Sequence, residues 1–309
     1  MKFLYLQDSH IKGVNPSSRK GDYYRDIMVK IDEVIALSKK LKVDCVIHGG
    51  DLFDSPKVSN LIVDDFIDKV ERAKIDWYIL PGNHDEEGHN WKNSKGTSLA
   101  HIFRRSKFIH EMAEIRRGDY QIKGFRYFHN IEEEIKQGLL LNAEVQFPLT
   151  IAITHAMITL KPFHPDVLHI VAKDINTDFD VILCAHYHEP WGIKEVNGTK
   201  FVNIGCFGRK SINEAVVNPA VLLIETDPKL SMKIIELKSA KPEEEVFDMD
   251  RIEKAKEFNA DIENFINSLK DTKITGLDLR GIIENIATEQ NVERDIVKEI
   301  IERIGHYEL

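Results

Sequence analysis

Short apolar runs alternate with longer amphipathic stretches through the first part of the chain. The short runs, typical of buried strands, are residues 2–7, 44–48 and 76–80. Residues 22–42 carry apolar side chains at helical spacing, and the pair Ser55-Pro56 predicts the start of a second helix that ends near Ala73. This order of strand, helix, strand, helix and strand predicts a parallel sheet with both faces covered.

The second half of the chain is richer in predicted strands. They are residues 149–154, 178–184, 191–196, 200–204, 220–225 and 231–237. Asn197-Gly198, between two of these runs, predicts a hairpin with a two-residue turn. Together with the first half, this pattern predicts an α/β protein in which two β-sheets pack against each other with helices outside.

The pattern changes again after residue 238. Residues 239–245 (Ser-Ala-Lys-Pro-Glu-Glu-Glu) have the composition of a linker. Beyond them, apolar residues at helical spacing predict helices at residues 250–269, 277–289 and 292–304. We therefore predict a main domain over residues 1–238 and a helical appendage over residues 239–309 that caps the site or binds a partner.

Composition limits the class of protein more than its function. The chain has 309 residues, of which 42% are hydrophobic and 30% charged, and its net charge is −9. No apolar stretch is long enough to cross a bilayer and the first residues resemble no signal peptide, so a cytoplasmic protein without membrane attachment is expected. The negative charge argues against nucleic-acid binding by charge alone, although bound cations and a local basic patch can supply a positive field.

Five polar clusters each follow a predicted strand. In order they are Asp8-Ser9-His10, Gly49-Gly50-Asp51-Leu52-Phe53-Asp54, Pro81-Gly82-Asn83-His84-Asp85, Thr154-His155-Ala156 and Ala185-His186-Tyr187-His188. Each cluster alone is a common sequence, but the carboxyl ends of such strands line one edge, where distant side chains converge. Carboxylates and imidazoles without thiolates suit Mn²⁺, Fe or Zn²⁺, and two such ions about 3.5–4 Å apart favour phosphoryl displacement.

These clusters resemble the calcineurin-like metallophosphoesterase pattern of D-x-H, G-D, G-N-H-D, H and H-x-H. The resemblance implies a four-layer α/β sandwich, in which helices flank two packed β-sheets, and a site for two divalent metal ions. Mn²⁺ is the leading expectation, with Fe, Zn²⁺ or Mg²⁺ as alternatives. The implied ligands are Asp8, His10 and His188 for the first metal, Asn83, His155 and His186 for the second, and Asp51 as the bridge.

Within the superfamily, the chain looks most like the DNA repair nuclease branch, which includes the nuclease subunit of the bacterial SbcCD complex and its phage, archaeal and eukaryotic relatives. The segments that carry this likeness are residues 50–56, 82–85 and 185–190. The resemblance implies a phosphodiester hydrolase that cleaves DNA as an exonuclease or endonuclease in repair or recombination, together with an SMC-type ATPase. It also implies a homodimer through helices around residues 57–73 and 98–106.

Two other functions stay open beside the nuclease. A small-molecule phosphodiesterase or phosphomonoesterase would use the same metal site, with the helical appendage as a lid. A scaffold that had lost catalysis would show eroded ligands, whereas all seven positions are filled here.

The resemblance also suggests catalytic and substrate-binding residues. His84 matches the histidine that contacts phosphate and helps to protonate the leaving oxygen. Asp85 would orient the His84 imidazole, with helix capping as an equal alternative. Asp54 stands where some of these nucleases have a histidine that positions DNA. Arg19 and Arg209, in loops that follow metal motifs or strands, are further candidates for contact with the substrate.

Overall fold

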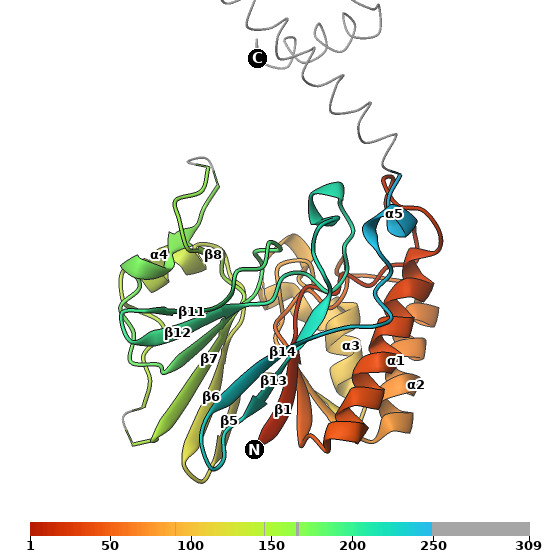
Figure 1. Cartoon of the computed structure of the whole chain (residues 1–309). Helices are drawn as coiled ribbons and strands as arrows, with labels where there is room; N and C mark the ends of the chain where they lie inside the picture. Colours follow the sequence, from red (N-terminus) through yellow and green to blue (C-terminus); the bar gives the residue numbers. More distant parts are fainter. Residues whose placement is uncertain (90, 145, 165–166, 249–309) are drawn as a thin grey trace, which may run out of the picture. The chain divides into compact units, whose positions relative to one another are not determined.

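Two six-stranded β-sheets lie face to face in the computed structural model, which describes residues 1–248 except 90, 145, 165 and 166 (Figure 1). The first sheet has the order β14-β13-β1-β2-β3-β4, with β1 (Lys2–Leu6), β2 (Cys45–His48), β3 (Asp76–Ile79), β4 (Ile109–Glu111), β13 (Ala220–Glu225) and β14 (Ser231–Glu236). The second has the order β11-β12-β10-β7-β6-β5, with β5 (Glu114–Arg117), β6 (Tyr120–Phe125), β7 (Leu149–Thr154), β10 (Val181–Cys184), β11 (Gly192–Val196) and β12 (Thr199–Asn203).

Helices cover the outer faces of both sheets, which confirms the predicted α/β sandwich. The first sheet carries α1 (Tyr23–Leu41), α2 (Asn60–Ala73) and α3 (Ser98–Arg105). The second carries α4 (Ile131–Lys136) and a small parallel pair, β8 (Ile158–Thr159) and β9 (Ile170–Val171). Short 3-10 turns are η1 (Glu87–His89), η2 (Trp91–Gly96), η3 (Ala172–Asp174) and η4 (Ile212–Glu214). Among the described residues, no helix combines the length and the apolarity that crossing a membrane requires.

The core follows from the two-residue period of the strands. Phe3 and Tyr5 of β1 point between the two sheets, whereas Leu4 and Leu6 point toward the helices, and all four are fully buried. The parallel strands of this sheet are therefore buried on both faces and need continuous apolar sequence. This is why their positions are readily predicted.

Helix α1 begins and ends close to the predicted limits. The Asp22 side chain accepts a hydrogen bond from the Arg25 N–H at 3.0 Å and caps the first turn. Lys42, in the left-handed conformation, ends the helix. Helix α2 begins at Asn60, so its predicted start at Ser55-Pro56 is wrong.

The segment before α2 makes tertiary contacts instead of a helical turn. The Ser55 hydroxyl donates to the Lys57 carbonyl, and the Val58 N–H donates to the Ser98 hydroxyl. The Ser98 N–H in turn donates to the Pro56 carbonyl at 2.7 Å. These bonds to the start of α3 hold the segment in a loop, which a cap signal in the sequence does not reveal.

The predicted hairpin is present, and three strands of the six-stranded sheets, besides the short pair β8 and β9, were not predicted. Asn197 and Gly198 both have positive φ, as a type I′ turn between β11 and β12 requires. Strands β4, β5 and β6 are additional. β5 is an edge strand with mostly exposed, charged residues, so it lacks the alternation that marks a half-buried strand.

The compact unit continues past the boundary expected at residue 238, to Phe247. Glu33 of α1 accepts hydrogen bonds from the N–H groups of Lys238 and Ser239, and Phe247, after α5 (Glu243–Val246), is fully buried. The division into two domains stays a prediction, and the helices predicted at residues 250–304 lie outside the described residues.

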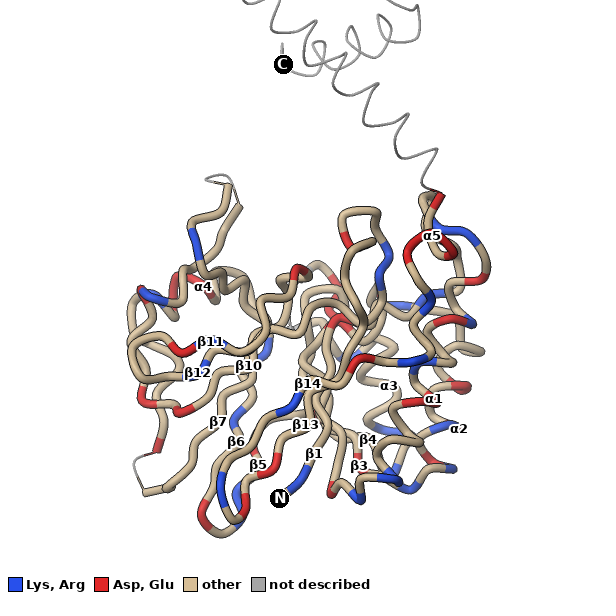
Figure 2. Tube along the Cα trace, viewed as in Figure 1, with Lys and Arg blue, Asp and Glu red and all other residues tan. Residues whose placement is uncertain are grey.

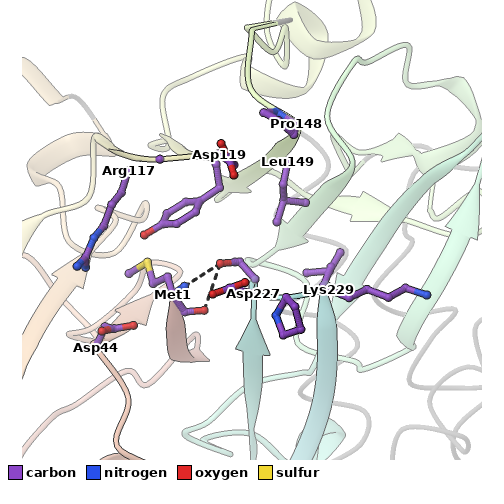
Figure 3. Close-up of a pocket in the computed structure, with 13 residues that line it drawn as sticks. Met1, Asp44, Arg117, Asp119, Pro148, Leu149, Asp227 and Lys229 are labelled. Carbon is purple, nitrogen blue, oxygen red and sulfur yellow. Dashed lines mark hydrogen bonds between the residues drawn. The ribbon is translucent and has the colours of Figure 1, made fainter.

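The two ends of the sandwich differ in what they carry. A cavity at one end is lined by residues at or before the amino ends of the parallel strands, including Met1, Asp44 and Leu149 (Figure 3). The polar clusters lie at the other end. Lys and Arg are spread over both layers and mixed with Asp and Glu (Figure 2).

Candidate metal centre

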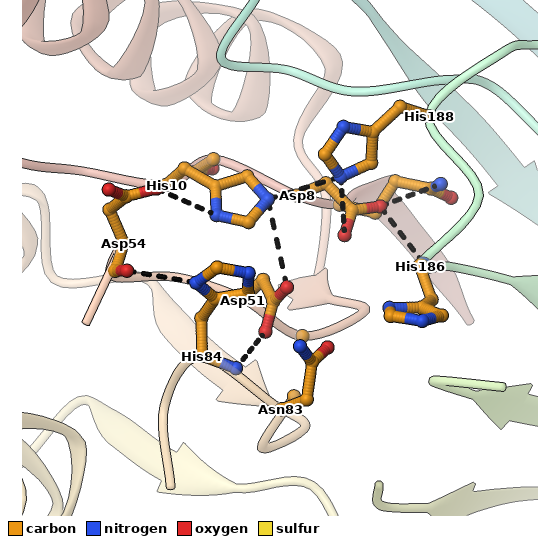
Figure 4. Close-up of polar contacts among 12 residues, drawn as sticks. Asp8, His10, Asp51, Asp54, Asn83, His84, His186 and His188 are labelled. Carbon is orange, nitrogen blue, oxygen red and sulfur yellow. Dashed lines mark hydrogen bonds and ion pairs between the residues drawn. The ribbon is translucent and has the colours of Figure 1, made fainter. Parts of the chain in front are cut away.

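The five polar clusters meet at the carboxyl ends of β1, β2, β3, β7 and β10. Strands β1, β2 and β3 run parallel in one sheet, and β7 and β10 run parallel in the other. The loops that follow them therefore converge at one rim, where Figure 4 draws the side chains. We call Asp8, His10 and His188 the first ligand group, and Asn83, His155 and His186 the second, with Asp51 between them.

Asp8 is fully buried, and its two carboxylate oxygens have different surroundings. Oδ2 accepts hydrogen bonds from the Gln7 side chain at 3.0 Å and from the His186 N–H at 3.2 Å. Oδ1 has no hydrogen-bond partner and lies 3.7 Å from Nε2 of His188. A buried carboxylate oxygen without a partner is costly unless a cation binds it.

Asp51 repeats this arrangement. Oδ1 accepts the His84 N–H at 2.9 Å, whereas Oδ2 is buried and has no hydrogen-bond partner. Oδ2 lies 3.6 Å from Nε2 of His10 and 3.3 Å from Nε2 of His155. It therefore faces both ligand groups, as a bridging oxygen must.

The remaining donor atoms converge on these two oxygens. Nε2 of His10 and Nε2 of His188 are 3.1 Å apart, and Nε2 of His155 is 3.1 Å from Oδ1 of Asn83. Among the described residues, four sets of donor atoms each lie within 4.8 Å of one another: Asp8, His10 and His188; His10, Asp51 and His84; Asp51, His155 and His186; and His188, Cys206 and Glu214. The donor set therefore fits divalent cations of the kind that carboxylate and imidazole ligands bind.

The pKa values of residues at the rim also indicate a site for cations. Burial lowers the pKa of His155, but the Asp51 carboxylate raises it more, and the net pKa is about 10. Burial raises the pKa of Asp51, but the neighbouring His155 lowers it further, to well below its usual range. The surroundings of the Asp51 carboxylate and the His155 imidazole thus favour positive charge at this rim.

The backbone of the site is held in an uncommon conformation. Asp8, His10, Asp51 and His186 all have positive φ, between 48° and 73°. Such residues cost about 1–3 kcal/mol each and cluster at functional sites. Backbone hydrogen bonds between the loops maintain them: the Asp8 N–H donates to the Gly50 carbonyl at 3.0 Å, and the His10 N–H donates to the Asp51 carbonyl at 2.9 Å.

Two glycines allow the second ligand group to approach the backbone closely. A Cβ on Gly50 would lie 2.2 Å from Nδ1 of His155, and one on Gly82 would lie 2.2 Å from Oδ1 of Asp51. Gly50 also has a φ of 116°, which residues with a side chain rarely adopt. These glycines explain physically why the G-D and G-N-H-D motifs begin as they do.

His84 lies next to His10 of the first ligand group and is half-buried. Its Nδ1 is 2.9 Å from the carbonyl oxygen of Asp54, and its ring makes an edge contact with His10. Because a carbonyl oxygen only accepts, Nδ1 carries a proton. Nε2 is then the nitrogen that exchanges a proton.

Asp85 does not orient His84 as expected. Its carboxylate accepts the backbone N–H groups of Leu52 at 3.3 Å, Phe53 at 3.1 Å and Gly82 at 3.0 Å. Asp85 therefore joins the loop of Asp51 to the loop of Asn83. The helix-capping alternative does not describe these contacts either, because the N–H groups belong to loops.

Arg19 and Arg209 are buried and make internal contacts rather than facing the rim. Arg19 donates to the Arg209 carbonyl at 2.8 Å and to Asp26 at 2.9 Å. Arg209, only 4% exposed, donates to carbonyl oxygens of Ala215 and Val217. The sequence could not separate these residues from surface arginines, because both follow functional motifs in loops.

Lysines take the place that these arginines were expected to fill. Nζ of Lys210 is 2.9 Å from Oδ1 of Asp54 and 3.3 Å from Nδ1 of His10. Nζ of Lys12 is 2.9 Å from the other oxygen of Asp54. Asp54 thus reaches the rim as expected, with two partly exposed lysines on it.

Glu214 is a further residue of the site that the sequence motifs did not indicate. It lies after β12, and its Oε1 is 2.6 Å from Nδ1 of His188. Burial raises the pKa of Glu214, but the hydrogen bond with His188, the charge of His188 and the hydrogen bond from the Ser211 N–H together lower it to about 2. Its one sequence signal is the spacing Ser211-x-x-Glu214, a capping box that marks the start of η4.

A model of the family described as calcineurin-like phosphoesterase matches residues 1–190. The chain therefore belongs to the calcineurin-like phosphoesterase family, whose members act with divalent metals. Among curated proteins, it is similar to the DNA double-strand break repair protein Mre11 of Methanococcus maripaludis, with 25% identity over 207 residues (64% of this chain and 54% of the relative). Mre11 of Thermoplasma acidophilum is 25% identical over 200 residues, 60% of this chain and 51% of the relative.

The chain spans about half the length of the curated relatives that it matches. Among solved structures, the calcineurin-like phosphoesterase YfkN of Bacillus subtilis has 14% identity and a TM-score of 0.44, and the match covers 76% of this chain and 90% of that chain.

Proposed function

We propose that this chain is a nuclease that hydrolyses phosphodiester bonds of DNA with two divalent cations, Mn²⁺ first among them. The hydrolytic part is supported by family membership and, above all, by one observation: Asp8 and Asp51 each aim a buried, unpartnered oxygen at converging imidazoles. The choice of DNA is supported by the likeness to Mre11 proteins.

The two ligand groups would each hold one cation, with Asp51 shared between them. When bound, such a pair lowers the pKa of water and stabilises charge on the phosphate. The first group brings the charge of Asp8, whereas the second brings the neutral Asn83. The protein's part is to fix this geometry before substrate arrives, through the backbone bonds among the loops.

His84 would supply the proton that the leaving oxygen needs. Its Nδ1–H is held by the Asp54 carbonyl, so the ring cannot rotate without losing that bond. Nε2 is then the only nitrogen that can give a proton to the substrate, in the protonated form of the ring. Half-burial of His84 leaves it accessible from solvent.

Lys12 and Lys210 would bind the phosphate groups of the substrate. Their ammonium groups are partly exposed and share the Asp54 carboxylate, which holds them at the rim next to His10. A phosphate that arrives there can replace Asp54 as their partner. This local positive charge offsets the overall charge of −9 near the site.

An SMC-type ATPase partner and a homodimer complete the proposal. Both are supported by the likeness to repair nucleases alone. Co-purification of the full chain with a candidate ATPase, followed by light scattering of the free chain, tests them separately from hydrolysis.

The test of the function is hydrolysis by the purified full chain. It is given single- and double-stranded oligonucleotides and, in parallel, a small phosphodiester such as bis(p-nitrophenyl) phosphate, with Mn²⁺ and with a chelator. We expect Mn²⁺-dependent cleavage of DNA. Cleavage of the small diester without cleavage of DNA, with or without the partner, would overturn the DNA assignment in favour of a small-molecule phosphodiesterase.

The variant His84→Ala links the activity to this site. We expect it to keep bound Mn²⁺ and to lose turnover by about 10²–10⁴-fold, the usual contribution of a general acid. His101→Ala, an exposed histidine of α3, is the matched control and keeps full activity. Unchanged turnover in His84→Ala would contradict its role.

A further inference from the structure

Glu214 lies beyond the part of the chain that the family model matches. It ends the short helix η4 in the loop that connects β12 to β13, and it is only 6% exposed. A carboxylate so deeply buried needs partners for both of its oxygens. Those partners explain what the residue does.

The two oxygens of Glu214 have separate tasks. Oε2 accepts the backbone N–H groups of Lys210 and Ser211, which fixes the carboxylate to its own loop. Oε1 lies 2.6 Å from Nδ1 of His188. The carboxylate is therefore held from one side by the backbone and faces the imidazole with the other.

This contact decides which nitrogen of His188 carries a proton. An ionised carboxylate only accepts hydrogen bonds, so Nδ1 of His188 must be the donor. In the neutral ring Nε2 then has a free lone pair. Nε2 lies 3.1 Å from Nε2 of His10 and 3.7 Å from Oδ1 of Asp8, the two other members of the first ligand group (Figure 4).

We propose that Glu214 is a positioning residue that holds His188 with its Nε2 lone pair directed at the first ligand group. Glu214 acts through His188 and does not touch the substrate. Such outer partners fix the tautomer and the orientation of a ligating histidine and raise its basicity. This inference rests on the cation site of the proposed function but not on DNA as the substrate.

Other histidines of the site have different outer partners. Nδ1 of His155 is 3.0 Å from the Gly49 carbonyl, a backbone group that no substitution removes. Nδ1 of His10 is 3.4 Å from Asp54, whose carboxylate also accepts from two lysines. Of these three contacts, that of Glu214 with His188 is both the shortest and the one a side-chain change can reverse cleanly.

The variant Glu214→Gln makes the role of Glu214 testable. Its amide oxygen can still accept the N–H groups of Lys210 and Ser211, so the loop keeps its cap. Its amide nitrogen then faces His188 and donates to Nδ1, which puts the proton of the ring on Nε2. Nε2–H cannot bind a cation, so the change should act on the first ligand group alone.

Two measurements report this change without any substrate. In the metal-free wild-type protein, ¹⁵N NMR of the histidine side chains, assigned with His188→Gln, should show the Nδ1–H tautomer for His188. In Glu214→Gln it should show Nε2–H. Titration with Mn²⁺ alone should then give a dissociation constant for one of the two cations that is about 10–100-fold weaker, with the other changed less than about threefold.

Glu71→Gln is the matched control. The Glu71 carboxylate also accepts a hydroxyl and a backbone N–H, from Ser106 and Lys107, but it touches no histidine of the site. Its Mn²⁺ binding should equal that of the wild type. A purely structural role of Glu214 would lower the stability of Glu214→Gln and leave the tautomer of His188 unchanged.

Either of two results would overturn the proposal. One is an Nε2–H tautomer of His188 in the metal-free wild type, which does not depend on Glu214→Gln and so holds even if that variant does not fold. The other is wild-type Mn²⁺ affinity in folded Glu214→Gln. If the chain does not cleave DNA, the tautomer of His188 and the Mn²⁺ affinity still test the role of Glu214. The two proposals therefore fail independently.

Discussion

The two ligand groups of the candidate metal centre are supported in different ways. The outer nitrogens of His10 and His188 in the first group face carboxylates, Asp54 and Glu214, from separate loops. In the second group, His155 faces the Gly49 carbonyl and packs against Gly50. Side chains support the histidines of the first group, whereas the backbone of Gly49 and Gly50, in the G-D motif, supports His155 of the second group.

This difference has a physical consequence. The Glu214 carboxylate makes His188 a stronger ligand, and Asp8 adds a charge that Asn83 does not. The first group should therefore bind its cation more tightly than the second. Its geometry, however, depends on the loop of residues 205–214, whereas the support of His155 in the second group comes from the backbone of Gly49 and Gly50.

Removal of the bridge should have the largest effect and should abolish the difference between the groups. Asp51→Asn keeps the size of the side chain and an oxygen for the His84 N–H, but it removes the charge that both groups share. We expect Mn²⁺ affinity to fall by more than the roughly 10–100-fold that loss of an outer partner costs, and turnover to reach background.

Metal content after gel filtration in Mn²⁺ measures this effect. Asp180→Asn is the control, because Asp180 accepts hydrogen bonds from Thr150 at the other end of β10. Two cations retained in Asp51→Asn would contradict the bridging role.

A methyl group on Gly50 should damage the second group and spare the first. In Gly50→Ala the Cβ would lie 2.2 Å from Nδ1 of His155, so the ring must move away from the Gly49 carbonyl. We expect one cation to be lost, with a fall in the free energy of unfolding of about 1–3 kcal/mol from the unfavourable φ. Mn²⁺ titration and urea unfolding measure the two effects.

Gly21→Ala separates strain from the clash. Gly21 also has positive φ, but a Cβ there would meet nothing within 4 Å. This control should lose stability and keep both cations. If Gly50→Ala also kept both at wild-type affinity, the close packing of His155 would not matter for binding.

The loop behind the first group should respond to pH through Lys30. Nζ of this buried lysine donates to the Phe207 and Gly208 carbonyls, and burial, with Arg209 nearby, lowers its pKa from 10.5 to about 7. The unfolded state therefore binds more protons than the folded state between pH 7 and 10.5, so the stability of the wild type rises with pH in that window.

The variant Lys30→Met lacks this dependence. Between pH 7 and 9, the free energy of unfolding should rise by about 1–3 kcal/mol more in the wild type than in Lys30→Met. Urea unfolding at pH 7, 8 and 9 measures it, and Lys40→Met, on the exposed side of α1, should follow the wild type. Parallel pH profiles for wild type and Lys30→Met would contradict a depressed pKa.

The difference between the supports of the two ligand groups also explains what the sequence could predict. The buried strands, α1 and the ligand clusters were predictable, because apolar periodicity and strand ends are local features. The supports of the second group lie inside the motifs, at Gly49 and Gly50. Lys210 and Glu214 lie beyond the last motif, and only tertiary structure brings them to the rim.

The wrong expectations have the same origin. Asp85 was expected to orient His84 from the resemblance to the family motif, but its carboxylate turns to the loop of Leu52 and Phe53. Arg19 and Arg209 were candidates for the rim because they lie in loops that follow a metal motif or a strand. Here backbone carbonyls within the fold bind both guanidinium groups.

The central claim is that seven side chains hold two cations with Asp51 between them. Anomalous diffraction at the manganese edge, from crystals grown in Mn²⁺, tests it most directly. Two peaks about 3.5–4 Å apart are expected, one beside Asp8, His10 and His188 and one beside Asn83, His155 and His186. A single peak, or one beside Cys206 and Glu214 instead, would contradict it.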